Sequence, residues 1–188
     1  GKKIDIAQPI FLKGEKCLEN ISENTECYFI EKNSKNTLWL LGDSHTRFLA
    51  LAGEEVANAL GINMKLYTAE ATTFPPVIKY QKLSKEIVGY LDDFKFLEKE
   101  LYRQIKVGDI ILLSMRMPYH FGGIYYGNPP SEFIFIKKDG SFGSQENYFD
   151  DWIASVINLS NMAQQKGAKV IIHTPTPEWE EELNNSCT

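Results

Sequence analysis

The sequence Gly-Asp-Ser-His at residues 42–45 has the residue types and spacing of a nucleophilic serine site. It directly follows the apolar run at residues 37–41 and precedes a segment with helical periodicity. At such a strand-to-helix corner Ser44 can project its hydroxyl into a crevice, where backbone N–H groups and the positive end of the helix stabilise an oxyanion. The alternative is that Asp43 or Ser44 only caps the helix. The position after a buried strand favours the catalytic interpretation.

A serine hydroxyl needs a base to act as a nucleophile at neutral pH, and the sequence has three histidines. His45 adjoins Ser44, but one step along a helix points it elsewhere, which favours a local hydrogen-bonding role. His173 ends a predicted strand and either reaches the crevice or is an ordinary rim residue. His120 lies in a predicted loop. The scattered His and Cys residues lack the close pair spacing of zinc sites, so neither a metal site nor a cofactor is predicted.

Short apolar runs alternate with helical segments along most of the chain. We expect strands at residues 37–41, 64–67, 109–114 and 169–173, and helices at residues 45–60, 82–105 and 152–165. The apolar face expected for the first helix consists of Phe48, Leu51, Ala52, Val56, Ala59 and Leu60, with Gly61 ending it. This alternation requires a parallel sheet covered on both faces. The predicted fold class is therefore α/β, as a three-layer α/β/α arrangement with a mainly parallel sheet.

Reactive sites in such sheets lie outside the carboxyl ends of the strands. The segments that this rule selects are residues 42–45, 71–76, 114–120 and 173–177. Aromatic residues follow the third of these segments and would form either a sugar-stacking wall or the packing of a long loop: Tyr119, Phe121, Tyr125 and Tyr126. Residues 133–142 predict a small β-hairpin insertion with a tight turn at Asp139-Gly140.

A chain of 188 residues with 43% hydrophobic residues suits a single globular core. Residues 1–36 are polar and are predicted to form an irregular N-terminal extension, which leaves residues 37–188 as the domain. Cys17 and Cys27 bracket a polar segment that a disulfide would close, and two free thiols are the alternative. Cys187 is then an odd thiol, which suggests a partner on another chain or beyond Thr188.

The charge and hydropathy patterns argue against a nucleic-acid partner and against a membrane-spanning helix within these residues. A net charge of -5 without a clustered Lys/Arg stripe is unsuited to gripping a phosphate backbone, so no nucleic acid is expected. No run approaches the roughly 18 apolar residues that a membrane-spanning helix needs. The first residues show no signal-peptide pattern.

Residues 40–45, Leu-Leu-Gly-Asp-Ser-His, resemble the first conserved block of the SGNH (GDSL-like) hydrolases. The variant with His after Ser is similar to the extracytoplasmic SGNH domain fused to acyltransferase-3 membrane proteins. Residues 72–76, 109–116 and 175–179, the last followed by Cys187, are similar to the pattern of that subgroup. The resemblance implies an SGNH/flavodoxin-like fold. It also implies that Ser44 attacks an acyl donor and passes the acyl group to water or a sugar hydroxyl.

Further site residues follow from the resemblance by position. Thr73 lies in the second block, where the family usually offers a Gly N–H to the oxyanion, and this chain has no Gly there. The third block normally supplies Asn, whereas this chain has Arg116, which would donate to the developing charge or be a salt-bridged surface residue. Asp43, His45 and His173 complete the candidates around Ser44.

The resemblance also implies a catalytic pair that this sequence lacks. The family completes its triad with an Asp-x-x-His pair, and no such pair occurs in the sequence. We expect the pair after Thr188, and the alternative is a dead site. The implied function is O-acyl, typically acetyl, transfer to a cell-surface glycan by an extracytoplasmic domain tethered to the membrane through a region outside this chain. Its partners would be an acyl donor, a glycan acceptor and a fused or separate membrane acyltransferase domain. The alternatives are a carbohydrate O-acetyl esterase and an inactive glycan-binding module.

Overall fold

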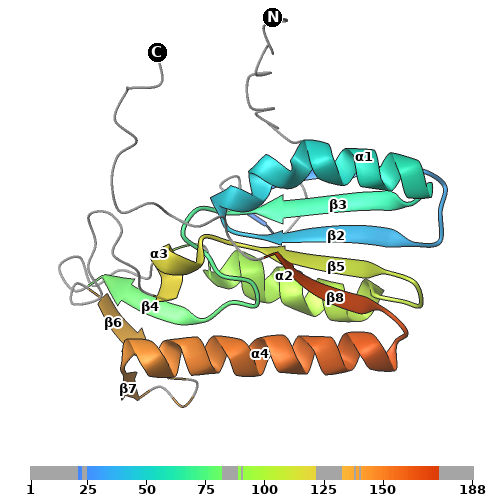
Figure 1. Ribbon diagram of the computed structural model, residues 1–188. Coiled ribbons are helices and arrows are strands. Elements are labelled where there is room, and N and C mark those ends of the chain that lie inside the picture. The colour runs from blue at the N-terminus through green and yellow to red at the C-terminus, as the bar shows by residue number, and fades with distance from the viewer. Residues whose placement is uncertain are drawn as a thin grey trace, which may run out of the picture.

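A computed structural model describes residues 21–22, 25–81, 89, 91–121, 133–137, 139 and 141–173. Its centre is a five-stranded sheet in the order β1-β3-β2-β5-β8 (Figure 1). The parallel strands are β2 (Thr37–Gly42), β3 (Asn63–Thr68), β5 (Ile110–Ser114) and β8 (Lys169–His173). These are the four predicted strands, and their carboxyl ends lie at one edge of the sheet.

Helices cover both faces of this sheet, which confirms the three-layer α/β/α fold. Helix α1 (Ala50–Leu60) lies on one face, and α2 (Leu91–Gln104) and α4 (Gln145–Gln165) lie on the other (Figure 1). Strand β2 is buried at every position because it has strands on both sides and helices on both faces. Helix α4 begins earlier than predicted, where Ser144 and Asn147 form a capping box.

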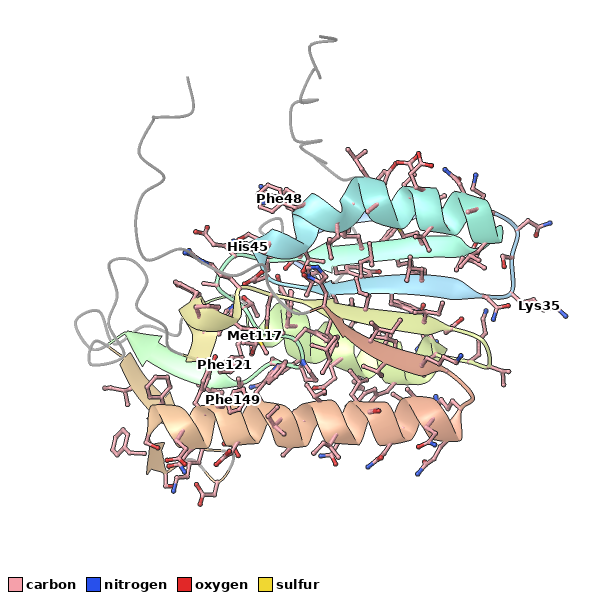
Figure 2. The ribbon with its side chains drawn as sticks, viewed as in Figure 1. Lys35, His45, Phe48, Met117, Phe121 and Phe149 are labelled. Carbon is pink, nitrogen blue, oxygen red and sulfur yellow. The ribbon has the colours of Figure 1, made fainter. Side chains whose placement is uncertain are left out.

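Helix α1 contacts the sheet through a face other than the predicted one. The large apolar residues expected inside are exposed, as Figure 2 shows for the first of them: Phe48, Leu51, Val56 and Leu60. The buried face consists of Ala50, Gly53 and Ala57. A Cβ atom at Gly53 would lie 2.5 Å from Leu40 Cδ1, so small residues allow the helix to approach the sheet closely. In addition, Ser44–Leu49 forms a 3₁₀ helix, η1, which shifts the phase of any periodicity counted from residue 45.

The N-terminal segment contributes a strand that the sequence pattern did not predict. Strand β1 (Glu26–Ile30) pairs antiparallel with β3, and Ile21 and Cys27 belong to the main core. The prediction of an irregular extension is therefore wrong for residues 26–30. Cys27 is disulfide-bonded. Cys17, its predicted partner, lies outside the described residues, as does Cys187.

The predicted hairpin insertion is present as β6 (Phe133–Ile136) and β7 (Phe142–Gly143). Strand β4 (Ile78–Gln81) pairs with β6 and completes a small antiparallel sheet. The predicted loop after β5 contains the short helix α3 (Met117–Phe121). Of the predicted helix at residues 82–105, positions 82–88 and 90 lie outside the described residues.

Candidate active site

The corner between β2 and η1 is fixed by close backbone packing. A Cβ atom at Gly42 would lie 1.6 Å from the carbonyl oxygen of Ser114, so only glycine allows β2 to pass β5 here. The Thr46 hydroxyl donates a 2.6 Å hydrogen bond to the same carbonyl oxygen. From β3, the Thr68 hydroxyl donates to the carbonyl oxygen of Asp43. The residue after Asp43, Ser44, is thus presented from a corner that three strands hold.

Asp43 caps η1, and its carboxylate joins three segments. Oδ1 accepts a 2.9 Å hydrogen bond from the His45 backbone N–H. Oδ2 accepts from the backbone N–H of Arg116 at 2.8 Å and contacts His120 Nε2 at 2.8 Å. Burial raises the pKa of Asp43, but the hydrogen bond and charge of His120 and the two backbone donors outweigh it, so the net pKa lies below its ordinary value. Asp43 is therefore ionised at neutral pH.

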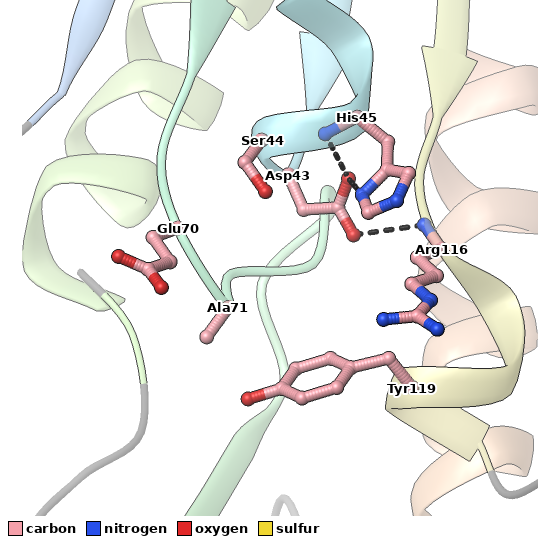
Figure 3. Close-up of a pocket in the computed structure, with 7 residues that line it drawn as sticks. All are labelled: Asp43, Ser44, His45, Glu70, Ala71, Arg116 and Tyr119. Carbon is pink, nitrogen blue, oxygen red and sulfur yellow. Dashed lines mark hydrogen bonds and ion pairs between the residues drawn. The ribbon is translucent and has the colours of Figure 1, made fainter. Parts of the chain in front are cut away.

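Ser44 opens into a pocket at the carboxyl ends of the strands (Figure 3). The pocket has a volume of about 140 Å³, and the described residues that line it are Asp43, Ser44, His45, Glu70, Ala71, Arg116 and Tyr119. Ser44 is half-buried, and its hydroxyl points into the space bordered by Glu70, Ala71 and Tyr119. The predicted presentation of Ser44 to solvent at the strand-to-helix corner is what the structure shows.

Opposite charges border this pocket. The Arg116 guanidinium lies on the same side as the Tyr119 ring, and the Glu70 carboxylate lies across from them (Figure 3). Burial raises the pKa of Tyr119, the negative charges of Glu70 and Asp43 raise it further, and the Arg116 charge partly opposes them. The tyrosine hydroxyl therefore stays protonated at neutral pH and can both donate and accept hydrogen bonds.

His45 is at the pocket, but it is separated from the serine hydroxyl. Its side chain is 45% exposed, and Nδ1 lies 3.7 Å from Asp43 Oδ1. The ring packs edge-on against Phe48, with 5.9 Å between ring centroids. In Figure 3 the imidazole lies across Asp43 from the Ser44 hydroxyl. At 3.7 Å the imidazole contact with Asp43 is too long for a hydrogen bond, and the local hydrogen bond is made by the His45 backbone N–H instead. This placement gives no support to His45 as the base.

Two predicted candidates lie away from the lining of this pocket. The Thr73 hydroxyl accepts a 3.1 Å hydrogen bond from the Val77 N–H and also bonds Tyr148, so it fixes a loop against α4. His173 Nδ1 lies 3.2 Å from the Ser114 hydroxyl at the ends of β8 and β5. In place of Thr73, Ala71 lines the pocket with a φ of 55°, a left-handed conformation that is uncommon for a residue other than glycine.

Sequence reasoning missed one residue of this region and assigned another to the wrong setting. Glu70 was not singled out, although it follows the predicted second strand at the edge where reactive sites lie. His120 was assigned to a loop, yet its side chain is fully buried in α3 and contacts Asp43. No spacing rule links His120 to Asp43 because 77 positions separate them.

Within the described ranges, no group of three or more His, Cys, Asp or Glu residues is arranged to hold a metal ion. None of the helices that the structure describes is long and apolar enough to cross a membrane.

Comparison with known families decides the assignment of the fold. The family model described as the SGNH domain (fused to AT3 domains) matches residues 15–188. The chain belongs to this SGNH family. Its membership confirms the predicted resemblance and places the domain in a family of hydrolase and acyl-transfer enzymes whose members are fused to acyltransferase-3 domains. Searches of curated proteins and of solved structures gave no match to this SGNH domain.

Proposed function

We propose that this SGNH domain transfers an O-acyl group, most simply acetyl, to a cell-surface glycan through an acyl-enzyme on Ser44. The observation that supports it most directly is the half-buried Ser44 hydroxyl, which points into a pocket of an SGNH fold. Asp43 rather than Ser44 caps η1. Because the cap belongs to Asp43, this arrangement supports a Ser44 hydroxyl that is available for chemistry.

The reaction takes place in two steps. Ser44 Oγ attacks the carbonyl carbon of the acyl donor while a base accepts its proton, and the bond to the leaving group then breaks as that group is protonated. An acceptor hydroxyl repeats the attack on the acyl-enzyme and releases the serine. The base in this proposal is the imidazole of the family's Asp-x-x-His pair, expected after Thr188. Arg116, whose guanidinium lines the pocket, is the side-chain donor proposed for the oxyanion.

The remaining pocket residues are proposed to bind the acceptor. Tyr119 offers a ring on which a sugar can stack and a protonated hydroxyl. The exposed Glu70 carboxylate across the pocket can accept hydrogen bonds from sugar hydroxyls. Phe121, the other predicted wall residue in the described part of the chain, instead packs against Tyr148 and Trp152. Tyr125 and Tyr126 lie outside the described residues.

The family description, an SGNH domain fused to AT3 domains, supports an acyl donor delivered by a membrane acyltransferase domain. We accordingly propose an extracytoplasmic location, with the domain tethered to the membrane through a region outside this chain.

Product analysis tests this function. The full-length protein is incubated with an acetyl ester, with and without an acceptor glycan, and both products are measured by mass spectrometry. The proposal expects acetylated glycan that disappears in Ser44→Ala. Free acetate alone, equally dependent on Ser44, would indicate a carbohydrate esterase. Glycan binding without either product would indicate an inactive binding module.

A further inference from the structure

We propose that His120 is a positioning residue, which acts through Asp43 to hold the nucleophile and the opposite pocket wall in one geometry. The proposal rests on the function proposed above and adds a residue to it. His120 is absent from the described lining of the pocket but contacts two residues that line it, Asp43 and Tyr119, so its effect has to pass through other residues.

His120 and Asp43 form a buried pair of titratable side chains. The His120 side chain is 0% exposed and that of Asp43 is 3% exposed, with 2.8 Å between Nε2 and Oδ2. An ionised carboxylate only accepts hydrogen bonds, so Nε2 must carry the proton. A charge-assisted hydrogen bond of this kind is stronger than a neutral one and costly to leave unmade in a buried site.

Asp43 connects three segments whose relative positions shape the pocket. Its Oδ1 fixes the first turn of η1, which contains Ser44. Its Oδ2 fixes the backbone of Arg116 at the exit of β5. His120, which lies in α3, forms a hydrogen bond with the same oxygen. The residue before it, Tyr119, lines the pocket. The serine on one side and the Arg116–Tyr119 wall on the other are therefore held by a single carboxylate.

Removing the imidazole would leave Oδ2 with the Arg116 N–H and without the donor from α3. We expect the carboxylate to reorient and α3 to shift relative to η1. Reacting groups displaced by about 1 Å can lose on the order of 10²-fold in rate without any loss of substrate contact. The loss should appear in kcat more than in KM.

The kinetic test compares His120→Ala with His120→Gln in the full-length protein, with 4-nitrophenyl acetate as substrate. The glutamine amide can donate to Oδ2 in place of Nε2. We expect His120→Ala to lower kcat at least about 10-fold with KM changed less than about threefold, and His120→Gln to recover most of the loss. Phe121→Leu is the matched control, since it loosens the same helix against Trp152 without contacting Asp43.

The spectroscopic test does not depend on activity. Nitrogen NMR of His120 should show a protonated Nε2 whose resonance shifts in Asp43→Asn.

Wild-type kcat in His120→Ala would overturn the proposal. So would equal losses in His120→Ala, His120→Gln and Phe121→Leu, since that pattern means destabilisation only. If wild-type protein forms no adduct on Ser44, the proposed function fails. The pairing then fails as well only if the Nε2 signature is missing.

Discussion

Two serine and histidine neighbourhoods lie at the same edge of the sheet and differ in what surrounds them. At the β5 and β8 ends, the Ser114 hydroxyl lies 3.2 Å from His173 Nδ1, a distance suited to a nucleophile and its base. Ser114 is, however, only 4% exposed, and it is absent from the described lining of the pocket. At the β2 end, Ser44 is half-buried and lines the pocket. Access to a substrate therefore distinguishes the two serines better than the nearness of an imidazole.

The surrounding polar groups explain this difference. The Ser114 backbone packs against Gly42, and its carbonyl oxygen accepts from Thr46, so Ser114 belongs to the scaffold of the corner. Beside Ser44, the capping role falls to Asp43, whose carboxylate is satisfied by backbone and imidazole donors. One serine supports the corner and the other is presented by it.

The largest effect is expected from Gly42→Ala, which would break the contact between the two neighbourhoods. The new Cβ atom would lie 1.6 Å from the Ser114 carbonyl oxygen, so β2 and β5 would have to separate. We expect the free energy of unfolding to fall by about 3 kcal/mol or more, measured by urea denaturation. Gly61→Ala is the control, because Gly61 has a φ of 62° but open space around its Cβ position. Its cost should be only about 1 kcal/mol. Equal costs would contradict the close-approach explanation.

A smaller, pH-dependent effect is expected from Asp43→Asn. The pKa of Asp43 is lowered in the folded protein, so its ionised form contributes stability above the unfolded pKa of about 3.9 and loses it as the pH falls through the folded value. At pH 7 we expect a cost of about 1–2 kcal/mol from the weakened cap and the altered His120 hydrogen bond. Urea denaturation between pH 7 and pH 3 should show the gap between wild type and variant narrowing below about pH 4. A constant gap would count against an ionised Asp43.

Removing the Tyr119 ring tests whether the pocket beside Ser44 binds the acceptor. Tyr119→Ala should raise KM for the acceptor glycan about two- to tenfold, because a stacked aromatic contact contributes roughly 0.5–1.5 kcal/mol. Tyr119→Phe should keep most of the affinity. Transfer assays at varied acceptor concentration measure both. An unchanged KM in Tyr119→Ala would exclude this ring from acceptor binding.

The smallest effect is expected at the other serine. Ser114→Ala removes the contact with His173 but leaves the carbonyl oxygen that Thr46 uses. The rate of Ser44 acylation should stay within about twofold, and stability should change by no more than about 1 kcal/mol. A large fall in acylation rate would show that the Ser114–His173 pair takes part in the chemistry.

The sheet and the serine corner could be predicted because their signals are local. Strands such as β8 were correct at both ends, since a short apolar run between turn residues has few other readings. The position of Ser44 followed from the same signal. The packing of α1 could not be predicted, because the contact was decided by Ala50, Gly53 and Ala57, whose small size matters more than their hydrophobicity.

Contacts between distant segments account for the rest. Strand β1 contains strand-favouring residues in Tyr28, Phe29 and Ile30, but polar residues on both sides of this short run obscured the signal, and its place in the sheet depends on pairing with β3. His120 meets Asp43 only after β5 and α3 are in place. Thr73 was assigned from the family's second block, but its hydroxyl bonds Val77 and Tyr148, and Ala71 takes the place beside the pocket.

The central claim is that the Ser44 hydroxyl forms an acyl-enzyme. Intact-mass measurement of the full-length protein after brief exposure to an activated acetyl ester, followed by peptide mapping, tests it directly. We predict one acetyl adduct located on Ser44 and none in Ser44→Ala. An unmodified wild-type protein, or an adduct that persists in Ser44→Ala, would contradict the account.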